Sequence, residues 1–371
     1  MRIVKFCLAI ALMIALVSAW KQPDEPMPTG PYALQYPASF GGRFTIPANN
    51  PLTQEGVYLG RLLFYEPRLS KTNTISCGSC HQQNRAFTDG RALSIGVSGK
   101  PTSRNSMSLA NLLWVRQFFW DGRAASLEDQ VRVPLTHTDE MGMAPEEAAK
   151  ALQQTGFYPA LFRRVFGSDT ITDARISKAI AQFERTLISA NSRYDQYQQG
   201  HYTLTEAEQN GLHLFSSAPA PERGIRGGNC AHCHGGLKLV QELFHNNGLD
   251  QVAPDAGRQT ITGLGLDHGR FRVPTLRNIA LTAPYMHDGR LATLEAVIDH
   301  YSDHIQSSPS LSRELMADSD KPTGFHFTTK EKSDLLAFLP LLTDSSFVTN
   351  PQFSDPNNLK RTAVKPHHST N

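Results

Sequence analysis

Two short cysteine motifs constrain this chain of 371 residues more than any other feature. Residues 77–81 read CGSCH and residues 230–234 read CAHCH, so both have the pattern C-x-x-C-H. In this pattern the two thiols add to the two vinyl groups of a haem, and the adjacent imidazole reaches the iron as its proximal ligand. The motifs predict two covalently bound haem c groups, and the residues that hold them are Cys77, Cys80, His81, Cys230, Cys233 and His234.

Two other readings of the motifs are a thiol redox pair and a zinc site. Each would have to explain why a histidine directly follows both cysteine pairs, and a zinc site would more often use four cysteines. The chain has 5 cysteines in all, too few for a disulfide-stapled scaffold of this length. The haem interpretation is therefore favoured.

The fifth cysteine, Cys7, lies in a segment with the pattern of a secretory signal peptide. Arg2 and Lys5 precede an apolar run over residues 6–17, and small residues end it at Ala19. The run of about 12 residues is shorter than the roughly 20 that span a membrane, so a cleaved signal is favoured over an anchor. We expect residues 1–19 to be removed near Ala19, and the mature protein to be periplasmic with no membrane span.

The overall charge argues against some classes of partner. Lys and Arg number 36 and Asp and Glu number 34, which gives a formal net charge of +2. A net charge so close to zero argues against a strongly basic nucleic-acid-binding protein. The hydrophobic content of 40% is typical of a globular chain.

Similar helical patterns precede the two motifs. A helix is predicted from Thr53 to about Tyr65, with Gly60, Leu63 and Phe64 in a Gly-x-x-Leu-Phe pattern, and a Thr205/Glu208 capping box opens the same pattern at residues 211–215. Such an internal repeat indicates two related modules. Alternating strand patterns are hard to find. We therefore expect a mainly all-α fold of two cytochrome c-like haem domains with long irregular loops.

Amphipathic helices are expected to close both modules. One contains Ile176, Ile180, Phe183 and Leu187 at helical spacing before about Ala190, and the other follows a Thr328/Glu331 capping box. The predicted domains are residues 20–203 and residues 204–345, each with one haem. Residues 346–371 form a polar C-terminal tail.

Two further stretches carry a family resemblance. Residues 118–130 read FFWDGRAASLEDQ, and residues 273–278 (VPTLRN) run on to 282–289 (TAPYMHDG). On these motifs the chain resembles the bacterial di-haem cytochrome c peroxidase family, and within it the MauG-like branch. The resemblance covers roughly Pro51 to Pro356 and implies an enzyme that acts on peroxide. It also implies that the haem of the first domain is peroxidatic and that the haem of the second domain transfers electrons.

The resemblance assigns three candidate catalytic residues. Glu140 and Gln130 match a pair above the N-terminal haem, where a carboxylate moves a proton between the peroxide oxygens and an amide orients the peroxide. Trp120 matches a tryptophan between the two haems and is a candidate electron relay. The alternatives are a helix-capping carboxylate near Pro145 for Glu140 and ordinary aromatic core for Trp120.

At two positions this sequence has a different residue from many members of that family. Val97 stands where those members have a histidine that caps the first iron, and no other histidine lies between His81 and Trp120. We therefore expect an N-terminal haem that is open and active without reductive activation. For the C-terminal haem, Tyr301 stands where many members have a methionine ligand.

A tyrosine ligand would favour ferric iron and lower the reduction potential. Met286 is the rival sixth ligand, and the remaining alternatives are His300, His287 or no ligand.

The resemblance also implies a calcium site. Asn105 would contribute its side chain, and Thr282 and Pro284 their backbone carbonyls, which are the oxygen donors that Ca²⁺ prefers. Arg272 and His287 are candidate contacts to haem propionates, with surface packing as the alternative.

Three functions fit these observations to different degrees. The favoured one is reduction of hydrogen peroxide to water with electrons from a small cytochrome c or a cupredoxin. The second is MauG-like oxidation of a partner protein through a high-valent di-haem state, which Val97 and Tyr301 favour. The third is a non-enzymatic di-haem electron carrier, which would not need Gln130 and Glu140. By analogy with the family, a homodimer is also expected.

Overall fold

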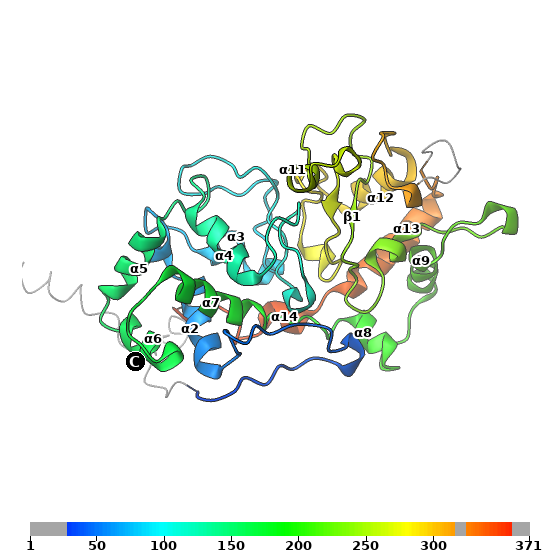
Figure 1. Ribbon diagram of the computed structural model, residues 1–371. Helices are drawn as coiled ribbons and strands as arrows, with labels where there is room; N and C mark the ends of the chain where they lie inside the picture. Colours follow the sequence, from blue (N-terminus) through cyan, green and yellow to red (C-terminus); the bar gives the residue numbers. More distant parts are fainter. Residues whose placement is uncertain (1–27, 316–323, 358–371) are drawn as a thin grey trace, which may run out of the picture.

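A computed structural model describes residues 28–315 and 324–357. The predicted signal peptide lies outside these residues. The described chain is mainly helical, as expected, and Figure 1 shows two helical halves side by side. Among the described residues, no helix is long and apolar enough to cross a membrane. The first half contains α2 (Gln54–Phe64), α3 (Cys77–Cys80), α4 (Leu127–Thr136), α5 (Pro145–Gln153), α6 (Tyr158–Phe166) and α7 (Asp173–Glu184).

The second half begins after α7 and contains most of the remaining helices. They are α8 (Arg193–Gln198), α9 (Glu206–Ser216), α10 (Cys230–His234), α11 (Gln259–Thr262), α12 (Leu294–Asp303) and α13 (Thr329–Phe338), followed by α14 (Ser345–Thr349). The strands β1 (Phe244–His245) and β2 (Phe271–Arg272) form an antiparallel pair. This pair was not predicted, because strands of two residues are too short to show an alternating pattern.

The core of the first half is built where α2 crosses α7. The Thr53 hydroxyl caps α2 by accepting a hydrogen bond from the Gly56 amide at 3.0 Å. Leu59 and Leu63 are fully buried on the inner face of the helix. Gly60 lies against the backbone of Ala179 in α7, so closely that an added Cβ would overlap the Ala179 carbonyl. Close helix contact therefore depends on glycine at this position.

The second half repeats this arrangement with α9 and α13. The Thr205/Glu208 and Thr328/Glu331 capping boxes predicted from the sequence are both present. Gly211 lies against the backbone of Asp334 in α13, as Gly60 lies against Ala179. The repeated sequence pattern thus corresponds to a repeated helix crossing.

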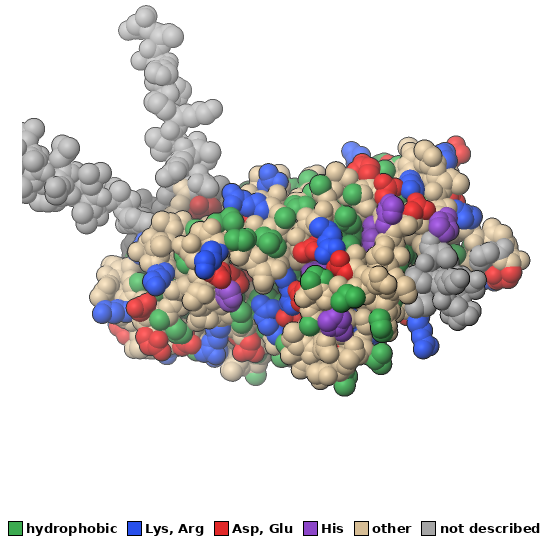
Figure 2. All heavy atoms as spheres, turned by 90° about the horizontal axis from the view of Figure 1, so that it is seen from above, with side chains coloured by type: hydrophobic (Ala, Val, Ile, Leu, Met, Phe, Trp, Pro, Cys, Tyr) green, Lys and Arg blue, Asp and Glu red, His purple; other side chains and the backbone are tan. Residues whose placement is uncertain are grey.

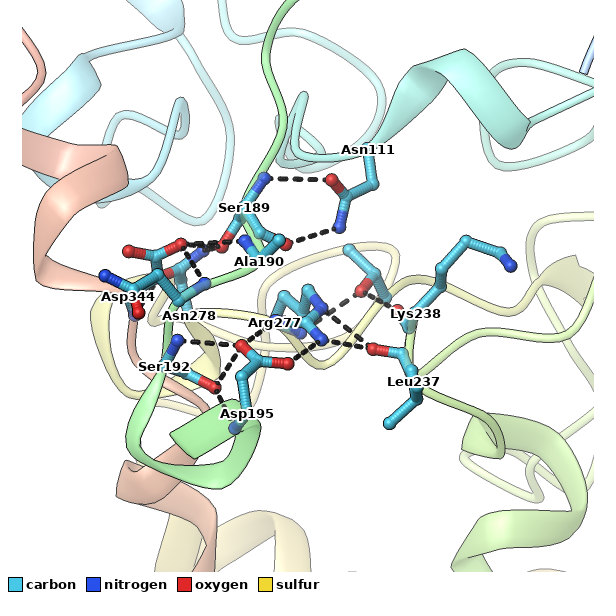
Figure 3. Close-up of polar contacts among 12 residues, drawn as sticks. Asn111, Ser189, Ala190, Ser192, Asp195, Leu237, Lys238, Arg277, Asn278 and Asp344 are labelled. Carbon is cyan, nitrogen blue, oxygen red and sulfur yellow. Dashed lines mark hydrogen bonds and ion pairs between the residues drawn. The ribbon is translucent and has the colours of Figure 1, made fainter. Parts of the chain in front are cut away.

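A buried polar seam holds the start of the second half against the rest of that half and against the C-terminal segment (Figure 3). Arg277 is fully buried and makes two hydrogen bonds of 2.7 Å to the Asp195 carboxylate. It also donates to the Leu237 carbonyl at 3.0 Å through Nε. Near this pair, Asp344 accepts hydrogen bonds from the Ser189 hydroxyl at 3.1 Å and from the Ala190 amide at 2.8 Å. The linker after α7 is therefore fixed to both the second half and the C-terminal segment.

The segment after α13 returns to the first half. Figure 1 shows α14 beside the helices of that half. Phe347 is 2% exposed and packs on Phe87, with ring centroids 5.5 Å apart. Gln83 donates through its side chain to the Asn350 carbonyl at 2.8 Å, and the Tyr65 hydroxyl donates to the Phe353 carbonyl at 2.7 Å. The last described residues are thus part of the core around the first cysteine motif.

Candidate functional site

The first cysteine motif forms the short helix α3. Ser76 caps it through a capping box with Ser79, and the helix ends at His81. His81 Nδ1 lies 2.8 Å from the Phe87 carbonyl, which holds the ring and leaves Nε2 available as a ligand. Burial lowers the pKa of His81, so the imidazole is kept in the neutral form that binds a metal.

The second motif has the same arrangement. His234 ends α10, and its Nδ1 lies 3.0 Å from the Pro274 carbonyl. Burial lowers the pKa of His234 to about 4. The cysteines of both motifs, Cys77, Cys80, Cys230 and Cys233, are not paired in disulfides. Each motif therefore has two cysteines and one oriented imidazole, which is the donor set that a haem c needs.

Two buried polar groups also fit a haem at these motifs. Arg272 is 6% exposed, and its guanidinium contacts the Phe119 carbonyl at 3.3 Å and the Met107 sulfur at 3.4 Å. Burial lowers its pKa to about 10 against the opposing charge of Glu242, and no described residue forms a salt bridge with it. A buried cation without a carboxylate partner suits a propionate. The second group, Gln130 Oε1, is buried without a hydrogen-bond partner in the described structure.

Gln130 is placed by α4. The Ser126 hydroxyl caps this helix by accepting from the Asp129 amide at 3.1 Å. Pro134 lies inside the helix, four residues after Gln130, and has no N–H to donate to the Gln130 carbonyl. The chain leaves the helix soon afterwards and turns into the segment that carries Glu140.

Glu140 lies in the turn between α4 and α5. Its carboxylate is 28% exposed, and its nearest ionic contact is a distant one of 3.9 Å to His137 Nδ1. Burial raises its pKa, while the charges of His137 and Arg123 oppose the rise. In addition to burial, the negative charge of Glu140 raises the pKa of the Cys77 and Cys80 thiols, so the Glu140 carboxylate lies near the first motif. Glu140 does not cap α5, whose N-cap is Ala144, so that alternative is wrong.

The loop that carries Val97 is fastened to the Glu140 turn. The Val97 amide donates to the Glu140 carbonyl at 2.8 Å, and the Ser98 hydroxyl donates to the Asp139 carboxylate at 2.9 Å. Gly96 lies so close to the Asp139 and Glu140 carbonyls that a side chain there would overlap them. The two loops therefore form one unit beside the first motif, and Val97 is part of it.

Trp120 lies at the contact between the two halves. Its indole N–H donates to the Asn105 carbonyl at 2.9 Å, and its own carbonyl accepts from the Arg272 amide at 2.6 Å. The side chain is partly buried. Because Arg272 belongs to the second half, Trp120 is bonded to both halves of the molecule.

The candidate sixth ligands of the second motif lie side by side. The Asn247 side chain donates to the Tyr301 hydroxyl at 3.4 Å and to the Met286 sulfur at 3.2 Å. Burial raises the pKa of Tyr301 to about 12. The two histidine alternatives have other contacts: His300 Nε2 lies 3.0 Å from the Asn247 carbonyl, and His287 stacks on Phe271. Tyr301 and Met286 are thus the alternatives that share one polar partner.

The three predicted calcium ligands line one small cavity of about 70 Å³ between the halves. Asn105, Thr282 and Pro284 all contribute to its walls, and Trp120 and Arg272 border it. The Asn105 side-chain amide donates to the Arg91 and Ala92 carbonyls at 2.9 and 3.1 Å. These bonds occupy its nitrogen and leave its oxygen as a candidate donor to a cation.

Sequence reasoning missed the groups that position the ligands. The Phe87 and Pro274 carbonyls orient the two histidines, and a backbone carbonyl leaves no mark in a sequence. It also missed Asn247, which lies in the polar stretch HNNG at residues 245–248. Nothing in the spacing of that stretch relates it to Tyr301, more than fifty residues later.

Comparisons with known proteins agree with this geometry. The family model described as "Di-haem cytochrome c peroxidase" matches residues 54–203. "Methylamine utilization protein MauG" of Methylorubrum extorquens is 37% identical over 82% of this chain and 83% of its own length. "Cytochrome c551 peroxidase" of Nitrosomonas europaea is 36% identical over 80% of this chain and 83% of its own length.

Solved structures show the same likeness. One described as a "MauG-like protein associated with microbial copper homeostasis" is 40% identical, has a TM-score of 0.75, and matches over 91% of this chain and 99% of that one. The diheme peroxidase BthA from Burkholderia thailandensis has a TM-score of 0.69 over 90% of this chain and 96% of that one. At 23% identity, the BthA comparison supports the fold alone.

Proposed function

Because this chain belongs to the di-haem cytochrome c peroxidase family, we propose that it reduces hydrogen peroxide to water in the periplasm. Two electrons and two protons convert one peroxide into two waters. Electrons would come from a small cytochrome c or a cupredoxin. The observation that carries the proposal is Glu140, a partly buried carboxylate beside the first motif whose pKa is raised by burial.

The two motifs would hold the haems that this family carries. Cys77, Cys80 and His81 would hold the N-terminal haem, and Cys230, Cys233 and His234 the C-terminal one. When bound, haem iron supplies a site for peroxide and the means to pass electrons to it. Everything else in the reaction would depend on side chains of this chain.

Glu140 would move the proton. Its carboxylate takes a proton from the peroxide oxygen nearer the first motif and returns it to the departing oxygen, which leaves as water. A raised pKa suits this role, because the group must both accept and release a proton near neutral pH. Gln130, with its buried and unpartnered Oε1, would hold the peroxide in position.

Trp120 would connect the two halves for electron transfer. The Asn105 carbonyl holds its indole N–H, and the Arg272 amide holds its backbone carbonyl.

The segment between β1 and β2 exposes the apolar side chains of Val252, Leu264 and Leu266, at 81%, 61% and 68%. Figure 2 shows hydrophobic and charged side chains mixed over the upper face of the molecule. Exposed apolar groups of this kind suit contact with a small redox protein.

Val97 predicts that the N-terminal haem is open without reductive activation. This prediction can be tested with the as-isolated, fully oxidised protein. Adding peroxide without any reductant should change the haem absorption spectrum at once, because no ligand has to leave the N-terminal haem. A protein that stays inert until it is partly reduced would contradict this. Steady-state consumption of peroxide with a reduced small cytochrome c then measures the peroxidase reaction itself.

A second candidate function is oxidation of a partner protein. Val97 and Tyr301 favour it, and so does the 37% identity to a MauG protein. The same turnover assay separates the two functions. Rapid, saturable oxidation of the small cytochrome supports the peroxidase, whereas a fast response to peroxide with negligible cytochrome turnover supports the oxidase.

We also propose that Asn105, Thr282 and Pro284 bind calcium, because they meet in one cavity that borders Trp120. Removing calcium with a chelator should slow electron transfer between the halves and leave both haems attached. Adding Ca²⁺ back should restore the rate. Full activity in protein shown by metal analysis to be free of calcium would contradict the proposal.

A further inference from the structure

The loop that carries Asn247 is held rigidly on both sides. The neighbouring Asn246 donates to the Ser308 and Ser310 hydroxyls at 3.1 and 2.9 Å. The Gly248 amide donates to the Asn246 side chain at 2.9 Å, and the Gly248 carbonyl accepts from the Gln306 amide at 2.8 Å. The Asn247 backbone carbonyl is in turn held by His300. The position of the Asn247 side chain is therefore fixed by its surroundings.

The side-chain nitrogen of Asn247 lies within hydrogen-bond distance of two acceptors. It donates to the Met286 sulfur at 3.2 Å and to the Tyr301 hydroxyl at 3.4 Å. In the described part of the chain, Asn247 supplies the hydrogen bond to the Tyr301 hydroxyl. Met286 and Tyr301 are also the two side chains that compete to be the sixth ligand of the C-terminal haem.

We propose that Asn247 is a positioning residue that makes Tyr301, rather than Met286, the sixth ligand. An anionic phenolate oxygen accepts a hydrogen bond about twice as strongly as a neutral acceptor, and a thioether sulfur is a weak acceptor. The amide therefore stabilises the ligating form of tyrosine more than that of methionine. The same amide nitrogen also donates to the Met286 sulfur. This inference rests on the proposed haem ligation.

The test replaces Asn247 by Leu, which has a similar size and no N–H. We expect Asn247→Leu to gain the absorption band of thioether-bound ferric haem, and the midpoint potential of the low-spin haem to rise, because a Met/His pair raises the potential. Adding Met286→Leu to this variant should remove the new band. Asn247→Asp provides a second variant, because it keeps the shape of the side chain and replaces the N–H donors with an oxygen. It should also shift the sixth ligand from Tyr301 to Met286.

Gln306→Leu is the matched control. It removes an exposed amide from the segment packed on the same loop, and its side chain donates to the His304 carbonyl rather than to either ligand. It should keep the wild-type spectrum and potential. An Asn247→Leu or Asn247→Asp variant with two haems and an unchanged spectrum and potential would overturn the inference.

Two further results distinguish failure of this inference from failure of the proposed Tyr301 ligation or of the proposed peroxidase function. A thioether band in the wild-type protein would show that Tyr301 is not the ligand, and would overturn both assignments while leaving the peroxidase assay to be judged by itself. A tyrosine ligand in a wild-type protein that does not consume peroxide would instead overturn the proposed function. The ligand spectra of the Asn247 variants would still decide the role of that residue.

Discussion

Glu140 shows how the surroundings of a single residue fit it for acid–base work. Burial raises its pKa above the usual value of 4.5, against the smaller opposing effects of His137 and Arg123. A general base must be ionised to accept a proton. The rate of reaction with peroxide should therefore fall as the pH is lowered through this raised pKa, which lies at a higher pH than for an exposed glutamate. Stopped-flow rates measured against pH would show the position of this acidic limb.

Replacing Glu140 by Gln should separate acid–base chemistry from haem binding. The variant should keep both haems and lose peroxide reactivity by a factor of about 10²–10⁴, together with the acidic limb. Glu147→Gln, an exposed position on α5, is the matched control and should keep both. Unchanged rates in Glu140→Gln would remove this residue from the mechanism.

At the scale of single residues, the sequence was informative where chemistry needs a fixed spacing. Cysteines and histidine in C-x-x-C-H must be adjacent to reach one haem, so both motifs were evident in the sequence. Asn247 could not be found in this way, because its contacts to Met286 and Tyr301 depend on how distant loops pack. The roles of Glu140, Gln130 and Trp120 came from resemblance and stay predictions.

At the scale of helices, the two Gly-x-x-Leu-Phe patterns can be tested as a pair. Gly60→Ala and Gly211→Ala each place a methyl group against the backbone of the partner helix. Such overpacking costs about 1–3 kcal/mol, so each variant should lower the melting temperature. Gly156→Ala is the control, because the space around Gly156 is open. A melting temperature equal to that of the wild type would contradict the prediction, because it would show that the two helices accommodate the methyl group with no loss of stability.

The helices themselves were largely predictable, and their packing was not. Capping boxes and apolar periodicity placed α2, α7, α9 and α13 within a few residues. The periodic pattern before Ala190 predicted a longer helix than the observed α7, which ends at Glu184. The chain continues through Ser189 and Ala190 as the linker that Asp344 fixes, so tertiary hydrogen bonds replace helical ones there.

At the scale of the whole molecule, the Arg277–Asp195 pair is the most buried charge contact of the seam. Burial by itself raises the pKa of Asp195, but the hydrogen bonds and charge of Arg277 outweigh it and hold the pKa below its usual range. A lowered folded-state pKa gives stability that is present near neutral pH and is lost as the pH falls through that pKa. Acid should therefore weaken this seam.

Arg277→Met should destabilise the protein by about 3–5 kcal/mol, because it leaves the Asp195 carboxylate buried without its partner. Thermal unfolding followed at several pH values would measure this. The loss should be largest near neutral pH and shrink in acid, where the wild-type pair is also weakened. Adding Asp195→Asn to the variant should recover part of the lost stability. A deficit that does not vary with pH would show that the pair contributes through packing alone.

The return of residues 345–353 to the first half bears on the order in which the protein matures. Phe347 and Phe353 belong to the core around Phe87, whose carbonyl orients His81. A polypeptide is synthesised from its N-terminus, so these residues leave the ribosome after everything else in that core. The surroundings of the first cysteine motif can therefore close only after residues 345–353 have been synthesised and have packed into this core.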